Sequence, residues 1–166
     1  MKPILNINEA ELEQSEKGTF YQESFQSIGR LIGAKKLGYG VSIVPPGKRA
    51  CPFHNHHVNE EMFFIIEGEG TYRFGDAQYK IKRGDLLAAP AGGQETAHQI
   101  INTGATDLKY LSVSTMESPD ICEYPDSGKI NIMVGTAPGG DKSNRRLQYI
   151  TRMSDNLDYW DGEPID

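Results

Sequence analysis

The stretch of sequence that decides the fold is residues 53–70, FHNHHVNEEMFFIIEGEG. It holds three of the four histidines of the chain within four residues, followed by two glutamates and an apolar run. The run EMFFIIE at residues 61–67 is typical of a strand covered on both faces. Because titratable groups beside a buried strand are costly without a partner, this stretch predicts a functional site.

The sequence around this stretch predicts further short strands. Gly75 and Asp76 join two alternating runs, which is the signal for a hairpin with a two-residue turn. The 18 glycines and 9 prolines favour many short strands over long helices. We therefore expect an all-β sandwich or barrel. The predicted strands cover residues 39–44, 61–67, 71–81 (the hairpin), 83–90, 96–102 and 108–115.

Composition limits the class of protein. A chain of 166 residues favours a single domain with a substantial core. The net charge of −6 argues against a broad surface for nucleic acid or an anionic membrane. No apolar run approaches the roughly 20 residues that span a bilayer, and residues 1–14 lack the apolar core of a signal peptide. With only Cys51 and Cys122, we expect reduced thiols and a cytoplasmic location.

The chain divides into three parts. Residues 1–27 are polar and acidic. We expect either a helical turn or an ordered arm there. Residues 28–115 contain the strand patterns and are predicted to be the barrel. Residues 116–166 are rich in Pro, Gly, Asp and Asn, so we expect an irregular C-terminal extension that packs on the barrel.

The histidine cluster predicts a metal site. Alternate side chains of a strand share a face, so His54 and His56 point the same way and His57 points the other way. Glu61 opens the next strand, and His98 lies in a later one. Imidazoles and a carboxylate that converge inside a barrel suit one divalent Zn, Fe, Mn, Ni, Co or Cu ion. For His98 alone, a place in the core or at the surface is the alternative.

The spacing of these residues resembles the first motif of the cupin family. The motif runs from a glycine through His-x-His and a glutamate to a second glycine. Here the matching residues are Gly47, His54, His56, Glu61 and Gly68, with one extra residue after Gly47. Only Glu61, and not its neighbour Glu60, keeps the six-residue distance to the second glycine, so Glu61 is the predicted ligand.

The second cupin motif is also matched. It runs from a glycine through Pro-x-Gly and a histidine to an asparagine. Here the matching residues are Gly84, Pro90, Gly92, His98 and Asn102. The gap before His98 is three residues longer than in the motif, and we expect the extra residues to lengthen the loop without moving the strand.

The resemblance implies a double-stranded β-helix, also called a jelly-roll barrel, with a metal at its centre. Its metal ligands would be His54, His56, Glu61 and His98. Residues 123–129, EYPDSGK, are similar to small single-domain bacterial cupins. On strand parity, Phe63 and Ile65 should line the barrel interior. Met62, Phe64 and Ile66 should face the other sheet or a partner subunit.

The first functional hypothesis is a metal-dependent enzyme acting on a small polar molecule, either dioxygenase-like or sugar-isomerase-like. No catalytic residue is assigned. The alternatives are a non-catalytic binding or sensing module and a barrel whose metal is structural. A sugar phosphate would need basic side chains in the pocket, and Lys80 and Lys82 are expected to face solvent. For Arg145 and Arg146, a solvated basic pair is the preferred interpretation, and a site for an anionic group is the alternative.

The apolar side chains on both faces of several strands predict a homodimer. A single small barrel fills its interior with one set of these side chains, and the other set needs a cover. Residues 1–35 are expected to contribute to the contact, and two-fold symmetry is the commonest arrangement for a homo-oligomer.

Overall fold

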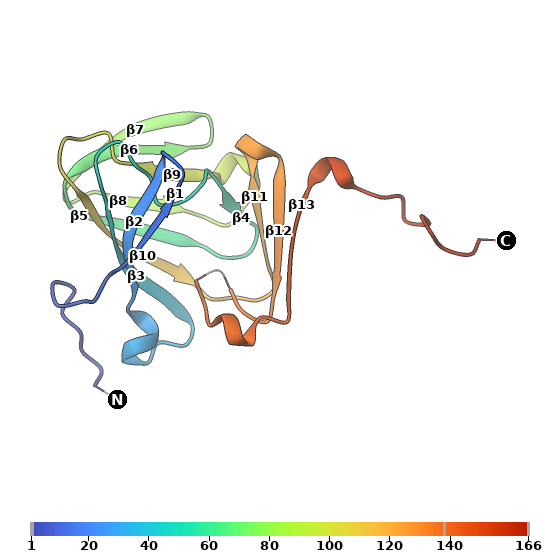
Figure 1. Ribbon diagram of the computed structural model, residues 1–166, viewed down its shortest axis with the longest axis horizontal. Coiled ribbons are helices and arrows are strands. Elements are labelled where there is room, and N and C mark those ends of the chain that lie inside the picture. The colour runs from blue at the N-terminus through green and yellow to red at the C-terminus, as the bar shows by residue number, and fades with distance from the viewer. Residues whose placement is uncertain (1, 138, 166) are drawn as a thin grey trace.

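The computed structural model describes residues 2–137 and 139–165 and contains three antiparallel sheets (Figure 1). In spatial order, the first sheet contains β1 (Glu13–Lys17), β2 (Tyr21–Ser27), β3 (Leu37–Val44), β10 (Leu108–Thr115), β5 (Glu61–Glu67) and β8 (Leu86–Ala89). The second contains β13 (Leu147–Arg152), β12 (Lys129–Val134), β11 (Asp120–Tyr124) and β4 (Asn55–His56). The third contains β7 (Ala77–Lys82), β6 (Glu69–Phe74) and β9 (His98–Ile101). The all-β prediction is confirmed.

The described part of the chain has five short 3₁₀ helices, four between strands and one after the last strand. None of the described helices is long and apolar enough to cross a bilayer. The 3₁₀ helices are η1 (Gly29–Ile32), η2 (Gln94–Thr96), η3 (Pro125–Ser127), η4 (Lys142–Asn144) and η5 (Met153–Asp155).

The barrel core follows the predicted alternation along β5. Phe63 and Ile65 are buried in the core, whereas Met62 and Phe64 are each 36% exposed on the opposite face. Burial of one face of a strand in this way fixes its register, because a shift by one residue would exchange the two faces. Glu61 is the first residue of β5 and has the same parity as Phe63, so this register directs its side chain to the interior face. The other core residues are Val44, Tyr72, Ile81, Leu87, Ala89, Ile100, Leu108 and Tyr110.

The predicted hairpin is also confirmed. Phe74 pairs with Ala77, so only two residues form the turn between β6 and β7. Gly75 adopts a φ of 53°, in the left-handed region that a glycine enters without steric cost. Lys80 and Lys82 of β7 are exposed, as expected.

Of the two forms expected for the N-terminal arm, a helical turn or an ordered arm, the structure shows ordered strands from Glu13. These strands form the hairpin β1–β2, and β2 pairs with β3 from Ser24 opposite Ile43 to Ser27 opposite Gly40. The local sequence has weak helical and strand signals alike, and pairing with the open edge of β3 decides the outcome. Residues 21–27 therefore extend the barrel sheet.

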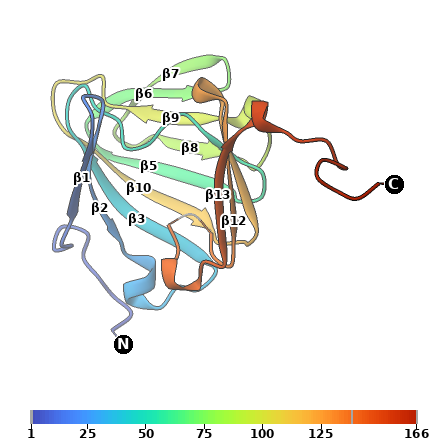
Figure 2. The same ribbon diagram turned by 45° about the vertical axis from the view of Figure 1, so that its right-hand side comes forward.

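The C-terminal extension is not irregular as predicted, because it contributes three strands to the second sheet. β11 pairs with β4 through Cys122 opposite His56, and Arg73 of β6 makes a bidentate ion pair with Asp126 at 2.7 and 2.8 Å. Figure 2 shows the hairpin β1–β2 on one side of the molecule and β12 and β13 on the other. The division of the chain at residues 27 and 115 stays a prediction.

The last described residues lie apart from the sheets. After η5, the chain projects away from the rest of the molecule (Figure 1). Leu157, Tyr159 and Trp160 are 70%, 84% and 57% exposed. No strand or helix is assigned to residues 156–165 of the described chain.

Candidate metal centre

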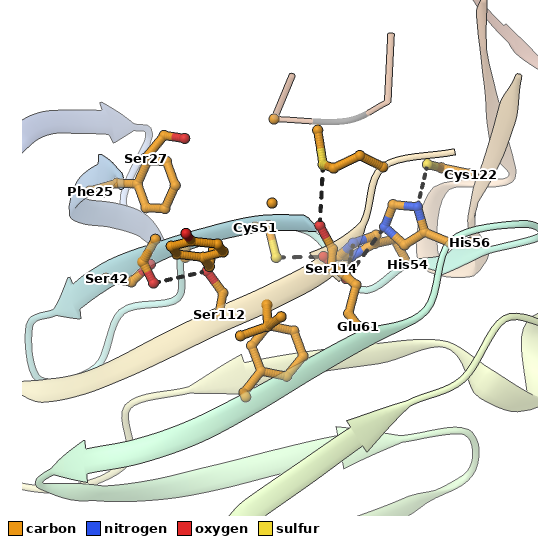
Figure 3. Close-up of a pocket in the computed structure, with 18 of the residues that line it drawn as sticks. Phe25, Ser27, Ser42, Cys51, His54, His56, Glu61, Ser112, Ser114 and Cys122 are labelled. Carbon is orange, nitrogen blue, oxygen red and sulfur yellow. Dashed lines mark hydrogen bonds and ion pairs between the residues drawn. The ribbon is translucent and has the colours of Figure 1, made fainter. Parts of the chain in front are cut away.

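Backbone pairing brings the candidate ligands together from three segments. His54 and His98 form an isolated antiparallel bridge, in which the His98 amide donates to the His54 carbonyl at 2.7 Å. His56 lies in β4 opposite Cys122, and Glu61 begins β5 beside β10. Figure 3 shows His54, His56 and Glu61 at one end of a pocket.

The three histidines converge on one carboxylate oxygen. The Nε2 atoms of His98, His56 and His54 lie 3.0, 3.4 and 3.8 Å from Oε2 of Glu61. Donor atoms of His54, Glu61 and His98 all lie within 4.8 Å of one another, as a metal-binding set requires. His56 reaches the same glutamate oxygen from the side of β4.

The outer nitrogen of each imidazole is engaged by an acceptor. Nδ1 of His54 lies 2.9 Å from the Pro52 carbonyl oxygen, and Nδ1 of His98 lies 3.2 Å from that of Thr96. A carbonyl only accepts, so these Nδ1 atoms carry the proton, and in the neutral ring Nε2 keeps its lone pair. This is the orientation that outer hydrogen bonds impose on metal-binding histidines. The chemistry of the donor set therefore fits a divalent metal.

The ionisation of the cluster follows from burial and proximity. Burial and the neighbouring His98 lower the pKa of His54 to about 4, which favours the neutral ring. Burial opposes ionisation of Glu61, but hydrogen bonds from His56 and His98 hold the pKa of its carboxyl well below the ordinary value. Burial opposes protonation of His56, but hydrogen bonds to Asp120, Cys122 and Glu61 raise its pKa to about 12. The cluster thus combines a neutral His54 with an ionised Glu61, and a metal would displace the proton that His56 shares with that carboxylate.

A second group of candidate ligands lies on the outer side of His56. It consists of His56, Asp120 and Cys122, all buried. Nδ1 of His56 lies 2.7 Å from Oδ2 of Asp120 and 3.2 Å from Sγ of Cys122. The other oxygen of Asp120 accepts from the backbone amides of Val58 and Ile121 at 3.2 and 2.9 Å. Asp120 is therefore well supplied with donors and orients the His56 ring.

The loop before His98 absorbs the extra residues of the second motif. Gln94–Thr96 form the 3₁₀ helix η2, and β9 begins directly afterwards at His98. The Gly92 amide donates to the His56 carbonyl at 2.9 Å, and the Asn55 side chain donates to the Gly92 carbonyl at the same distance. The longer loop thus remains tied to β4, and His98 keeps its place beside His54.

A cavity of about 390 Å³ opens beside the cluster. This volume is in the range of sites for small molecules. Its walls come from β2, β3, β5 and β10 of the first sheet and from β11 and β12 of the second, with Arg145 from the loop before β13. His54, His56 and Glu61 line it, and Tyr124 stacks on His54 with ring centroids 6.1 Å apart.

Several residues of this site were missed by reasoning from the sequence. Asp120 carries no motif, and nothing local indicates that β11 pairs with β4. Glu23 lies on the cavity because it shares one face of β2 with Phe25 and Ser27, in a segment that was interpreted as an arm. A solvated pair was the preferred interpretation of Arg145 and Arg146, with an anion site as the alternative; Arg145 is half-buried and lines the cavity, whereas Arg146 is exposed.

Other candidate residues lie where they were expected. Nε2 of His57 points away from the cluster and lies 3.1 Å from Oε1 of Glu123. Burial raises the pKa of the Cys51 thiol to about 12, so it stays protonated and unreactive at neutral pH. Tyr72 is a core residue, and Tyr110 both packs in the core and lines the cavity.

Comparisons with known proteins agree with this architecture. The cupin domain family matches residues 40–114. A crystal structure from Acidithiobacillus ferrooxidans, described as a candidate sugar phosphate isomerase, superposes with a TM-score of 0.78. The superposition covers 94% of this chain and 96% of that one at 24% identity, so it shows the likeness of fold over both terminal parts.

Two proteins are similar to this chain in sequence over about half of its length. An uncharacterised protein of Methanocaldococcus jannaschii is 34% identical over 54% of this chain and 62% of its own length. An oxalate-binding protein of Thermotoga maritima is 33% identical over 55% of this chain and 67% of its own length. This chain therefore belongs to the cupin family.

Proposed function

We propose that the chain binds one divalent transition metal through His54, His56, Glu61 and His98 and acts as a metal-dependent enzyme on a small polar molecule in the adjoining cavity. The observation that supports this is the convergence of three Nε2 atoms on Oε2 of Glu61, with every Nδ1 held by an outer acceptor. Nitrogen and carboxylate ligands suit Zn, Fe, Mn, Ni, Co or Cu.

The cavity also offers a group for proton transfer. A metal bound at the cluster would supply Lewis-acid chemistry to an oxygen of the bound molecule. Glu23 lines the same cavity, and Ser42 donates to its carboxylate at 3.4 Å. Burial raises the pKa of Glu23 and outweighs the opposing effect of this hydrogen bond. A carboxyl with a raised pKa exchanges its proton closer to neutral pH, as a general acid or base must.

The alternative is a protein that binds or senses its small molecule without converting it. The Thermotoga maritima relative is named an oxalate-binding protein, which favours this alternative. The Acidithiobacillus ferrooxidans structure, described as a candidate isomerase, favours an enzyme. Dioxygenase-like and sugar-isomerase-like reactions are the two forms of the enzyme hypothesis.

Elemental analysis of protein purified without added metal tests the proposal. We expect close to one divalent metal per chain, and removal of the metal by a chelator should lower the thermal stability. At a metal concentration 100 times its Kd, the stabilisation is about 2.7 kcal/mol. A protein that neither carries a metal nor binds added Zn²⁺, Mn²⁺ or Fe²⁺ would contradict it. Turnover assays on the metal-loaded protein then separate enzyme from binding module.

A homodimer is part of the proposal. Met62, Phe64 and Leu86 leave an apolar surface on the outer face of β5 and β8, and Phe20 and Leu31 are exposed in the first 35 residues. A second copy would cover such surfaces. Light scattering at micromolar concentration should give twice the mass of 18.4 kDa. A mass that stays at the monomer value as the concentration rises would exclude the dimer.

A cytoplasmic location is the last part of the proposal. Cys51 and Cys122 are both free thiols, which agrees with a reducing compartment. Fractionation of cells that express the chain, with detection by antibody, tests this location.

A further inference from the structure

Arg145 and Arg146 are neighbours in sequence, but they lie in different environments. Arg145 follows η4, is half-buried and lines the cavity, while the Arg146 side chain is exposed. The backbone amide of Arg146 donates to the Val134 carbonyl at 2.8 Å. This bond ties the loop to β12, so Arg145 stays at the cavity wall.

The guanidinium of Arg145 has a partner at one nitrogen and lacks one at another. Its Nη1 donates to Gln148, and Nε2 of Gln148 lies 3.4 Å from Oδ1 of Asn131, a buried residue that also lines the cavity. Within residues 2–137 and 139–165, the buried Nε of Arg145 has no hydrogen-bond partner. A buried donor is normally satisfied, and of the four buried side-chain atoms without a partner among these residues, only Arg145 Nε belongs to a residue that lines the cavity.

The charges around the cavity favour an anion as the acceptor for Arg145 Nε. Among the described residues that line the cavity, Arg145 is the only arginine or lysine. The acidic and histidine side chains that share the lining are Glu23, His54, His56 and Glu61. A divalent metal at the cluster would exceed the charge of Glu61, and Arg145 adds to this excess. An ionised Glu23 and the buried Asp120 behind His56 offset this excess, so Arg145 is the group in the lining to which a negatively charged molecule would be drawn.

We propose that Arg145 is a binding residue for an anionic group, a carboxylate or a phosphate, on the small molecule that the cavity takes. A guanidinium suits this role because its N–H groups form a fork that matches two oxygens of either group. The proposal rests on the proposed function, since the metal cluster forms the other end of the same site. It also removes the objection that a sugar phosphate would find no basic side chain, because this residue comes from outside the barrel segment.

The experiment compares three proteins: the parent chain, R145Q, and the control R146Q, which changes the exposed neighbour. Each is loaded with Zn²⁺, checked for metal content and melting temperature, and titrated by calorimetry with oxalate, glycerol 3-phosphate and uncharged glycerol. We expect the parent and R146Q to bind an anion but not glycerol, and R145Q to bind it about tenfold more weakly or worse. Whichever anion binds more tightly assigns the group as carboxylate or phosphate.

A further variant, R145K, keeps the charge but loses the fork and should bind with intermediate affinity. Equal anion affinity of R145Q and the parent chain would overturn the proposal, as would binding of glycerol as tight as that of its phosphate or no anion binding by the parent. Metal content is measured on the same samples. If no Zn²⁺ is bound but anion binding still depends on Arg145, the proposed function fails and the anion site stands.

Discussion

Glu61 and Asp120 are carboxylates on opposite sides of the His56 ring, and their neighbours differ in kind. Oε2 of Glu61 faces three imidazole Nε2 atoms and borders the cavity. Asp120 is fully buried and accepts from His56 Nδ1 and from the amides of Val58 and Ile121. The first carboxylate meets the ring nitrogens that would bind a metal, whereas the second meets a ring nitrogen and two amides that donate to it.

The neighbouring atoms therefore give the carboxylates of Glu61 and Asp120 different roles. Atoms that are all acceptors can share a small space only if a proton or a cation lies among them. Burial opposes ionisation of Asp120, but hydrogen bonds from His56 and Asn59 keep its pKa below the ordinary value. Asp120 therefore needs no metal and acts on the site by holding the ring of His56.

Replacement of Glu61 should have the largest effect. Glu61→Gln removes the charged ligand, so we expect the metal affinity to fall by more than the ~100-fold that follows from loss of an outer hydrogen-bond partner. Glu60→Gln is the matched control, since Glu60 is exposed beside it, and it should bind metal normally. Competition with a chromogenic chelator measures both affinities. Equal losses of metal affinity in the two variants would contradict the assignment of Glu61, in place of Glu60, as the ligand.

Replacement of His56 tests whether this ring belongs to the inner group. His56→Ala removes Nε2 from the cluster and Nδ1 from Asp120, so most of the bound metal should be lost. The measurement is metal stoichiometry after gel filtration. Full stoichiometry in this variant would remove His56 from the ligand set and leave His54, Glu61 and His98.

Replacement of Asp120 should have a smaller effect on the metal. Asp120→Asn keeps the shape but loses the charge that orients His56, so we expect the metal affinity to fall ~10- to 100-fold. Cys122→Ala, which changes the other neighbour of Nδ1, should bind metal almost as the parent does. A loss for Asp120→Asn as large as that for Glu61→Gln would end the distinction between the two carboxylates.

Asp126 should give the smallest effect, on stability alone. Its pKa is lowered by the hydrogen bonds from Arg73, so the pair stabilises the fold above the unfolded-state pKa near ~4. That contribution is lost as the pH falls through the lower folded-state pKa. For this exposed pair we expect Asp126→Asn to lower the free energy of unfolding by less than ~1 kcal/mol at pH 7. Urea unfolding at pH 7 and pH 3 should show a smaller difference at pH 3.

The barrel could be predicted from sequence because its signals are local. Parity along residues 61–67 separates Phe63 and Ile65 from the exposed face, and Gly75–Asp76 marks the hairpin. The motif spacings indicated the four candidate ligands that the structure brings together. Their assignment as metal ligands stays a prediction.

The rest of the site could not be predicted, because it depends on pairing between distant segments. Asp120 reaches His56 only because β11 pairs with β4, and Glu23 reaches the cavity only because β2 pairs with β3. Arg145 depends on the loop between β12 and β13. A strand in the C-terminal extension gains its stability from its neighbours more than from its own sequence.

The projecting C-terminal segment determines what an optical experiment on this protein can detect. Trp160 is the single tryptophan of the chain, and it lies in that segment, 57% exposed, beside the ring of Tyr159. Its emission will respond to whatever covers the segment and hardly at all to melting of the barrel. Tyrosine absorbance is the better probe of the interior, because Tyr72 and Tyr110 are buried there. Unfolding curves recorded with the two signals should therefore not coincide, even if the barrel melts in one step.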